Sequence, residues 1–143
     1  MATDRTAEVT WHGSLREGSG TIEQTTSGAI GSQAVSWPAR TEQPDGKTSP
    51  EELIAAAHAS CFSMQLSSAL AKAGNPPDEL RTSATVTFQP GTGITRSALS
   101  VVGRVPGVDE QGFREAADGA KANCPVSKAL AGVEITLDAR LAT

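Results

Sequence analysis

The two cysteines, Cys61 and Cys124, are the residues of this sequence best suited to chemistry. Ionised thiols are nucleophiles and can be oxidised reversibly. The two lie far apart in the chain, with Cys61 three residues after His58 and Cys124 directly before Pro125. No Cys-x-x-Cys or His-x-x-x-His pair accompanies them, which disfavours a metal site built from these cysteines with His58 and His12. The spacing favours thiol redox chemistry.

Each of these residues also has a plainer interpretation. Cys61 falls in the middle of an expected helix, so the helix N-terminus cannot favour its thiolate and a nearby cation is needed. Without one, Cys61 is a small buried hydrophobic residue. Cys124 stands where Pro125 breaks a helix, which suits a thiol that must move but also suits simple packing. His58 can be a core histidine that donates to a carbonyl or a serine.

Arg40 is the best candidate for the cation, because a guanidinium stays charged and offers a fork of donors. It could hold a thiolate ionised and bind a peroxide oxygen. The alternative is a solvated loop arginine paired with Glu42, and Arg16 and Arg5 compete with it on sequence alone.

Glu51 is the acidic residue that helix capping leaves unexplained. Ser49, Pro50 and Glu52 form the signature of a capping box. Glu51 precedes Cys61 by ten positions, which is about 15 Å along a helix. If both serve one site, Glu51 should come from a neighbouring subunit.

The pattern of apolar residues predicts six strands and two main helices around these residues. Three short strands in a meander are followed by a long helix, a hairpin, a second helix with a short helical turn, and a final strand. The expected strands are Ala7–Trp11, Thr21–Thr25, Gln33–Trp37, Arg81–Gln89, Ile94–Val105 and Val133–Leu141. The expected helical segments are Pro50–Ala73, Glu110–Ala122 and the turn Val126–Ala131. Strands in runs with helices between the runs indicate an α+β fold with largely antiparallel sheets.

Composition and length narrow the class of protein. The 143 residues suit one domain over residues 1–143, and the net charge of −4 gives no support for binding nucleic acid. No apolar leader opens the sequence, so we expect a cytoplasmic, reducing compartment in which any disulfide is transient. The segment Leu53–Ala71 has no charged residue, but its serines, Gln65 and His58 predict a helix buried within protein on nearly all sides and not a membrane span. A second copy of the chain would supply part of that cover.

Several blocks of this sequence together resemble the family of osmotically inducible protein C and organic hydroperoxide resistance protein (OsmC/Ohr). The PEEL-AAAH-CFSM and CP-VS patterns are the most specific, and His58 with Arg40 place the chain nearer to the OsmC branch. The matching blocks are Ala7–Gly13 (AEVTWHG), Leu15–Ile22, Thr48–Met64 (TSPEELIAAAHASCFSM), Asn123–Ser127 (NCPVS) and Glu134–Asp138.

The resemblance implies a homodimeric cysteine peroxidase, in which antiparallel sheets of about three strands wrap around long central helices and dimerisation completes the fold. By motif, Cys61 resembles the peroxidatic cysteine and Cys124 the resolving cysteine. Glu51 resembles the acidic residue that follows the proline at the helix start, and Arg40 the arginine of the site. The expected reaction reduces organic hydroperoxides, and hydrogen peroxide more weakly, through a Cys61 sulfenic acid and a Cys61–Cys124 disulfide.

The expected partners are a hydroperoxide and a dithiol reductant, such as a lipoyl protein or a thioredoxin-like protein, in an oxidative or osmotic stress response. No metal, flavin or haem is expected, and neither is a nucleic acid or membrane partner. An apolar setting from Ala57, Phe62, Met64 and Val126 would favour alkyl or fatty-acyl peroxides. Two other classes stay open: a hydrolase or transferase using Cys61 with His58, and a stress-related binding protein whose cysteines are structural.

Overall fold

The computed structural model describes all of residues 1–143 and divides into two compact units, Met1–Leu53 and Ile54–Thr143. The order of elements is the predicted one with one added helix, α1. The α+β class and the two three-stranded sheets are confirmed.

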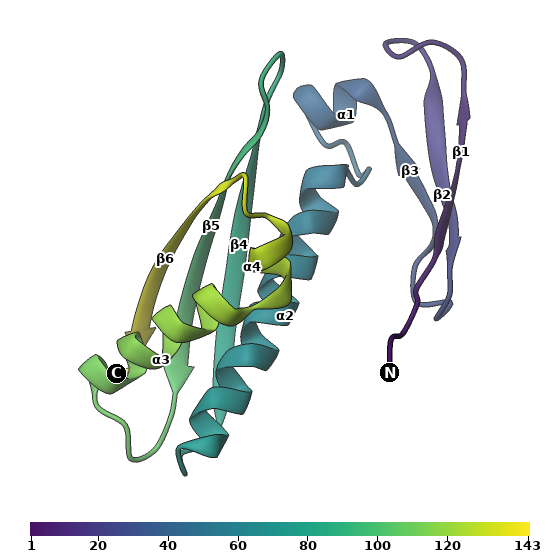
Figure 1. Ribbon diagram of the computed structural model, residues 1–143. Helices are drawn as coiled ribbons and strands as arrows, with labels where there is room; N and C mark the ends of the chain where they lie inside the picture. Colours follow the sequence, from purple (N-terminus) through teal and green to yellow (C-terminus); the bar gives the residue numbers. More distant parts are fainter. The chain divides into compact units, whose positions relative to one another are not determined.

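The first unit holds the meander β1 (Ala7–His12), β2 (Ser19–Thr25) and β3 (Gly31–Val35), in the order β1-β2-β3 with both pairs antiparallel (Figure 1). The expected alternation of β1 does not produce a buried face, because all six of its residues are exposed, including Val9 and Trp11. Among the hydrophobic residues of this unit, Ile22 and Ala39 are the buried ones.

Helix α1 (Trp37–Thr41) replaces the expected end of the third strand and the start of the following loop. Ser36 caps it by accepting a hydrogen bond from the Ala39 backbone N–H at 3.2 Å, and Pro38 occupies its first turn. Serine followed by an early proline is a helix-start signal. The consequence is that Arg40 lies in the last turn of a short helix and not in an irregular loop.

The long helix α2 (Pro50–Lys72) begins as predicted, with the Ser49 hydroxyl accepting from the Glu52 backbone N–H at 3.1 Å. The Glu52 carboxylate accepts from the Thr48 hydroxyl at 2.8 Å, so the second half of the capping box points to a different residue. At the other end Gly74 adopts a φ of 92°, and the Asn75 backbone N–H bonds back to Leu70 at 2.9 Å. This is the usual left-handed stop of a helix.

Within the second unit, α2 buries one stripe of residues and not nearly all of its surface. The stripe repeats every four residues, as one face of a helix does, and consists of His58, Phe62, Leu66 and Leu70. Met64 remains 73% exposed. The single chain therefore covers only part of α2, and the expectation that a second copy covers the rest stays a prediction. By length and composition α2 could cross a membrane, a property that core helices of soluble proteins share.

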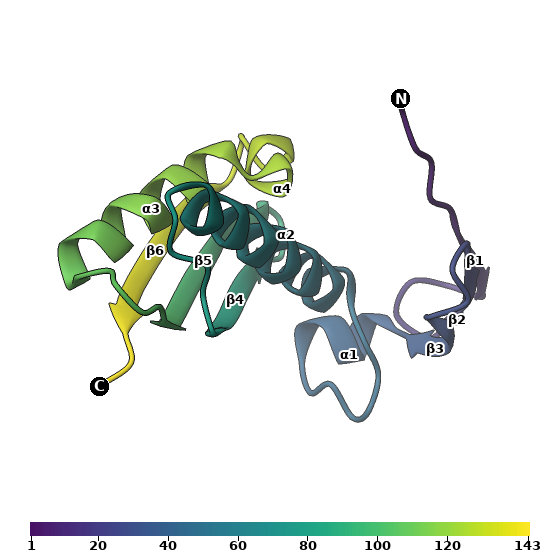
Figure 2. The same cartoon turned by 90° about the horizontal axis from the view of Figure 1, so that it is seen from below.

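The second sheet contains β4 (Glu79–Gln89), β5 (Gly93–Arg104) and β6 (Glu134–Leu141) in that order. β4 and β5 form the expected antiparallel hairpin, but β6 pairs parallel to β5, with Leu99 opposite Leu137. A parallel partner needs a crossover connection, and α3 (Glu110–Asn123) and α4 (Pro125–Ala129) form it. Both α2 and α3 lie on the same face of this sheet (Figures 1 and 2).

Gly103 on β5 packs against the ring of Phe113 on α3. A Cβ there would lie 2.5 Å from two ring atoms of Phe113, and neither residue is exposed. We expect Gly103→Ala to lower the free energy of unfolding by about 1–3 kcal/mol, because the ring or the strand must move. The matched control is Gly119→Ala in α3, where a Cβ would meet nothing within 4 Å. This change should raise the free energy of unfolding by about 0.5–1 kcal/mol, because alanine favours the helix more than glycine does. Urea titration measures both, and equal effects would contradict the packing described.

Candidate active site

The structure brings the two cysteines together within the second unit. Cys61 lies on α2, partly buried, and Cys124 lies fully buried at the junction of α3 and α4. The two thiols lie close enough for each to shift the pKa of the other, and neither takes part in a disulfide. Cys124 belongs to the hydrophobic core, and Cys61 and Val126 pack against it. A pair of thiols 63 positions apart thus meets because the crossover returns to α2.

The surroundings act differently on the two thiols. Burial raises the pKa of Cys61, and the thiol and charge of Cys124 add to the rise, while the backbone N–H of Val126 opposes it. Burial also raises the pKa of Cys124, but hydrogen bonds from the Ser127 backbone, Cys61, the Ser127 hydroxyl and the Val126 backbone outweigh it and leave that pKa lowered. A Cys61 thiolate therefore requires a positive charge from elsewhere.

His58 sits beside this pair in a fully buried polar cluster. Its Nδ1 lies 2.6 Å from the Ser97 hydroxyl on β5, and its Nε2 lies 2.8 Å from the Ser127 hydroxyl on α4. Both ring nitrogens are thus engaged by serines and not by Cys61, which does not fit a Cys–His nucleophile pair. The interpretation of His58 as a satisfied core histidine agrees with these contacts.

Arg40 and Glu51 form an ion pair within the first unit. The guanidinium Nη2 lies 2.7 Å from Oε1 of Glu51, and Nε lies 3.0 and 3.1 Å from the two carboxylate oxygens. Glu51 is 7% exposed, and the Arg40 guanidinium lies 5.9 Å from the centre of the Trp37 ring. Arg40 therefore pairs with Glu51, a partner that the loop interpretation did not include. The carboxylate fixes the direction of the guanidinium fork.

The apolar lining expected around the thiols is present in part. Phe62 is fully buried in the core, and Val126 packs against it. Met64 and Ala57 are exposed and contribute no lining in the single chain.

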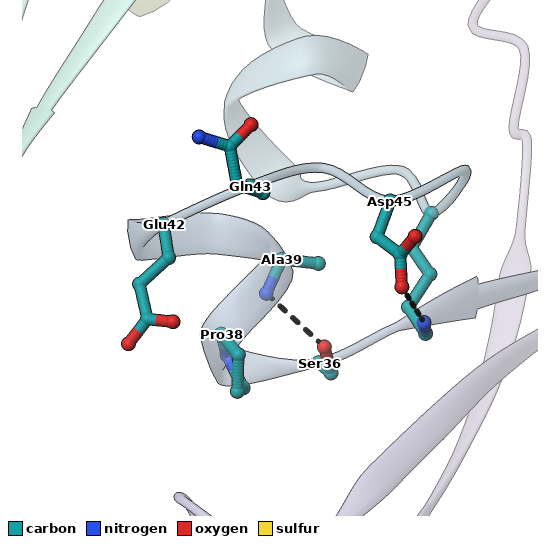
Figure 3. Close-up of a pocket in the computed structure, with 7 residues that line it drawn as sticks. Ser36, Pro38, Ala39, Glu42, Gln43 and Asp45 are labelled. Atoms are coloured by element: carbon teal, nitrogen blue, oxygen red, sulfur yellow. Dashed lines mark hydrogen bonds and ion pairs between the residues drawn. The ribbon is translucent and has the colours of Figure 1, made fainter.

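A separate open hollow of about 480 Å³ lies beside α1 (Figure 3). Ser36, Pro38, Ala39, Glu42, Gln43, Asp45 and Lys47 line it. Neither Arg40 nor either cysteine takes part, so the hollow is distinct from the candidate site. No three or more His, Cys, Asp or Glu side chains gather as metal ligands in the chain.

Comparison with known proteins decides the family. The sequence profile described as OsmC-like protein matches residues 43–138. The chain is 42% identical over 144 aligned positions to Peroxiredoxin OsmC of Escherichia coli strain K12, with 99% of each protein covered. The chain belongs to the OsmC family. A protein of the same name from Shigella flexneri matches equally well.

Solved structures of the OsmC family agree with the fold. The organic hydroperoxide resistance protein OhrB of Bacillus subtilis is 26% identical, with a TM-score of 0.67 over 94% of this chain and 98% of that one. An organic hydroperoxide resistance protein from Vibrio cholerae, 22% identical, superposes with a TM-score of 0.73 over 97% of this chain and 94% of that one. At that identity the second likeness shows the fold alone.

The sequence did not reveal the two serines that hold His58. Ser127 follows Cys124 by three residues, and this spacing at the start of a helix is a usable signal for contact. Ser97 gave no signal, because it is one of several polar residues in an alternating strand and meets His58 across 39 positions.

Burial lowers the pKa of His58 below its ordinary value, which gives a test through stability. Between the native pKa and about 6.5 the unfolded chain binds a proton that the folded chain does not. Stability from this residue is therefore fully present above the unfolded pKa and declines as the pH falls. We expect wild type to lose up to about 1.4 kcal/mol per pH unit more than His58→Gln below pH ~6.5. Denaturant titrations between pH 7.5 and 5.5 measure this difference, and parallel curves would contradict it.

Proposed function

We propose that this protein is a cysteine peroxidase that reduces organic hydroperoxides, and hydrogen peroxide more weakly, in two thiol steps. The Cys61 thiolate attacks the distal peroxide oxygen, releases an alcohol and becomes a sulfenic acid. Cys124 then attacks the oxidised sulfur, giving a disulfide and water. The observation that carries this proposal is that Cys61 packs against the core cluster to which Cys124 belongs, where each thiol shifts the pKa of the other. The names of the relatives, a peroxiredoxin and a hydroperoxide resistance protein, support it.

Arg40 would supply the missing charge. Because the pKa of Cys61 is raised in its own unit, the thiolate needs a cation, and the guanidinium oriented by Glu51 has the required fixed geometry. Ten residues separate Glu51 from Cys61, about 15 Å along α2. We therefore propose that the partner subunit of a homodimer brings its Arg40–Glu51 pair to this Cys61, so that one domain over residues 1–143 is completed by its copy.

Exposed apolar residues on both units are consistent with such a partner. Val9, Trp11 and Leu15 on the first unit and Met64 on α2 are between 40% and 73% exposed. Val9 and Trp11 are two residues apart and so share one face of β1, and an uncovered apolar strand face favours a protein interface. The proposal further places the protein in the cytoplasm, where a dithiol reductant, such as a lipoyl or thioredoxin-like protein, can reopen the disulfide.

One experiment separates this function from its rivals. The reduced protein is mixed with one equivalent of cumene hydroperoxide and then assayed for peroxide, free thiols and intact mass. We expect peroxide to disappear while both thiols are lost and the mass falls by two hydrogen atoms. Continuous consumption should then require a dithiol. Ester hydrolysis without thiol loss would favour a Cys–His hydrolase, and slow alkylation of both thiols with no peroxide loss would favour a binding protein.

A further inference from the structure

A buried chain of polar groups leads from β5 to the second sulfur. Ser97, His58 and Ser127 are 0%, 0% and 6% exposed, and the histidine joins the two hydroxyls at 2.6 and 2.8 Å. Ser127 follows Cys124 by three residues across the start of α4, and its hydroxyl is one of the groups that lower the pKa of the Cys124 thiol. None of these three residues has a part in the thiol steps described above, and a buried polar group that only packs is costly to retain.

The donors and acceptors in this chain can be assigned from its chemistry. A thiolate at Cys124 accepts only, so the Ser127 hydroxyl must donate to it and accept from its other neighbour. That neighbour is Nε2 of His58, which then carries the hydrogen, and the unprotonated Nδ1 accepts from Ser97. His58 and Ser127 each have one donor and one acceptor role, and no polar side-chain atom is left buried without a partner. The neutral histidine suits this arrangement, because its burial disfavours the imidazolium.

We propose that the Ser97–His58–Ser127 chain holds the Ser127 hydroxyl as a donor toward Cys124 and thereby makes Cys124 a reactive thiolate in disulfide formation. His58 acts only through Ser127, so it is a positioning residue. The Cys124 sulfur attacks the sulfur of the Cys61 sulfenic acid; the S–S bond forms as the S–O bond breaks. The departing hydroxide takes up the proton that Cys124 released and leaves as water. In this step Cys124 is oxidised and the sulfenic sulfur of Cys61 is reduced to the disulfide level.

The same positioning acts when the disulfide is reopened. Attack of a reductant thiolate on Cys61 expels Cys124 as a thiolate, and a better stabilised leaving thiolate departs faster. The titratable groups in contact with Cys124 are Cys61 and, through Ser127, His58, both on α2. The nearest charged residues along the chain are Lys121, at the end of α3, and Lys128, which is exposed on α4. β5 contributes the uncharged Ser97.

The test measures formation of the Cys61–Cys124 disulfide, here called closure, separately from the reaction with peroxide. The proposed function rests on that peroxide reaction. In one arm a hydroperoxide oxidises Cys61; in the other, an aromatic disulfide that releases a coloured thiolate forms a mixed disulfide at Cys61. In both arms Cys124 then attacks Cys61 and forms the disulfide. In the aromatic disulfide arm this attack releases a second coloured thiolate. The second arm reports on Cys124 even if the protein does not react with peroxides, so failure of the proposed function is separable from failure of this inference.

Four variants are compared at pH 7 and at higher pH. Ser127→Ala removes the donor, and we expect closure about tenfold slower, as is typical when a charged group loses a hydrogen bond. His58→Asn should be similarly slow, because the shorter amide cannot reach Ser127. His58→Gln should stay close to wild type, because its amide nitrogen can replace Nε2. Ser63→Ala, which removes a hydroxyl of α2 bonded to Thr82 at 2.7 Å, is the control and should leave closure unchanged.

A purely structural effect is distinguished by pH. The loss in closure rate of Ser127→Ala and His58→Asn should shrink as the pH rises, because Cys124 then ionises without the hydrogen bond. A protein with both changes should close no more slowly than one with either change alone. Sulfenic acid formation should keep its wild-type rate in all four variants. Closure as fast in folded Ser127→Ala as in wild type would overturn the proposal. A deficit in His58→Gln equal to that in His58→Asn would overturn the donor role as well.

Discussion

Cys61→Ser is expected to abolish hydroperoxide consumption, with a loss of at least about 10³-fold in the second-order rate constant, because the hydroxyl cannot take the place of the sulfur nucleophile. Cys124→Ser should keep the first attack at a rate near wild type. It should lose dithiol-dependent turnover through the disulfide but retain slow turnover when a small monothiol reduces the sulfenic acid directly. Stopped-flow measurement with cumene hydroperoxide, together with trapping of the sulfenic acid by dimedone, measures both steps.

Cys61 is assigned as the thiol that attacks the peroxide, and Cys124 as the thiol that forms the disulfide. This assignment depends on solvent exposure of the sulfur more than on the pKa of the thiol. Hydrogen bonds lower the pKa of Cys124 and burial raises that of Cys61, which by itself would favour Cys124 as the attacking group. Cys124 is 0% exposed, however, and Cys61 is the thiol with some exposure. A peroxide must reach the sulfur that it oxidises. Trapping of a sulfenic acid on Cys124 in Cys61→Ser at an undiminished rate would reverse the roles.

Arg40→Met is expected to slow sulfenic acid formation about 10²–10³-fold, the usual cost of removing a donor aimed at developing charge. The sign of the pH effect follows from the raised pKa of Cys61. Without the guanidinium, less thiolate is present at neutral pH, so the rate should rise about tenfold per pH unit until Cys61 titrates. The rate constant of wild type should reach its plateau at a lower pH than that of Arg40→Met. Rate constants measured from pH 6 to 9 give both profiles.

Two further variants test how Arg40 is held. Glu51→Gln should lose part of the same rate, and the double change should be no worse than Arg40→Met alone, because the carboxylate acts by orienting the guanidinium. Arg40→Lys keeps the charge but not the fork and should remain slow. The matched control is Arg16→Met, an exposed arginine in the first hairpin. A larger loss from Arg16→Met than from Arg40→Met would move the cationic role to Arg16.

Local signals predicted most of the fold. The start of α2 followed from Ser49 and Pro50, and its end from Gly74, because capping and left-handed backbone depend on neighbours in sequence. The hairpin of β4 and β5 followed from alternation and a glycine turn. The parallel pairing of β6 with β5 did not, since strand direction depends on where the crossover packs, and alternation is the same for either direction.

The roles given to the candidate site residues stay predictions. Residue type and motif gave the four expected residues, and the structure adds which of them touch. The Arg40–Glu51 pair depends on α1, which the pattern missed although Ser36 and Pro38 signal it. The contact of His58 with Ser97 depends on tertiary packing between a helix and a strand, for which the sequence carries no local trace.

The parallel docking of β6 sets the time at which the thiols become a pair during synthesis. The segment that carries Cys124 leaves the sheet after β5 and returns to it only at Glu134, so its second end is anchored only when the last strand has been made. A nascent chain lacking these residues has both sulfurs but no scaffold to hold them in contact. We therefore expect efficient disulfide formation between the two cysteines only after β6 has been synthesised and has paired with β5.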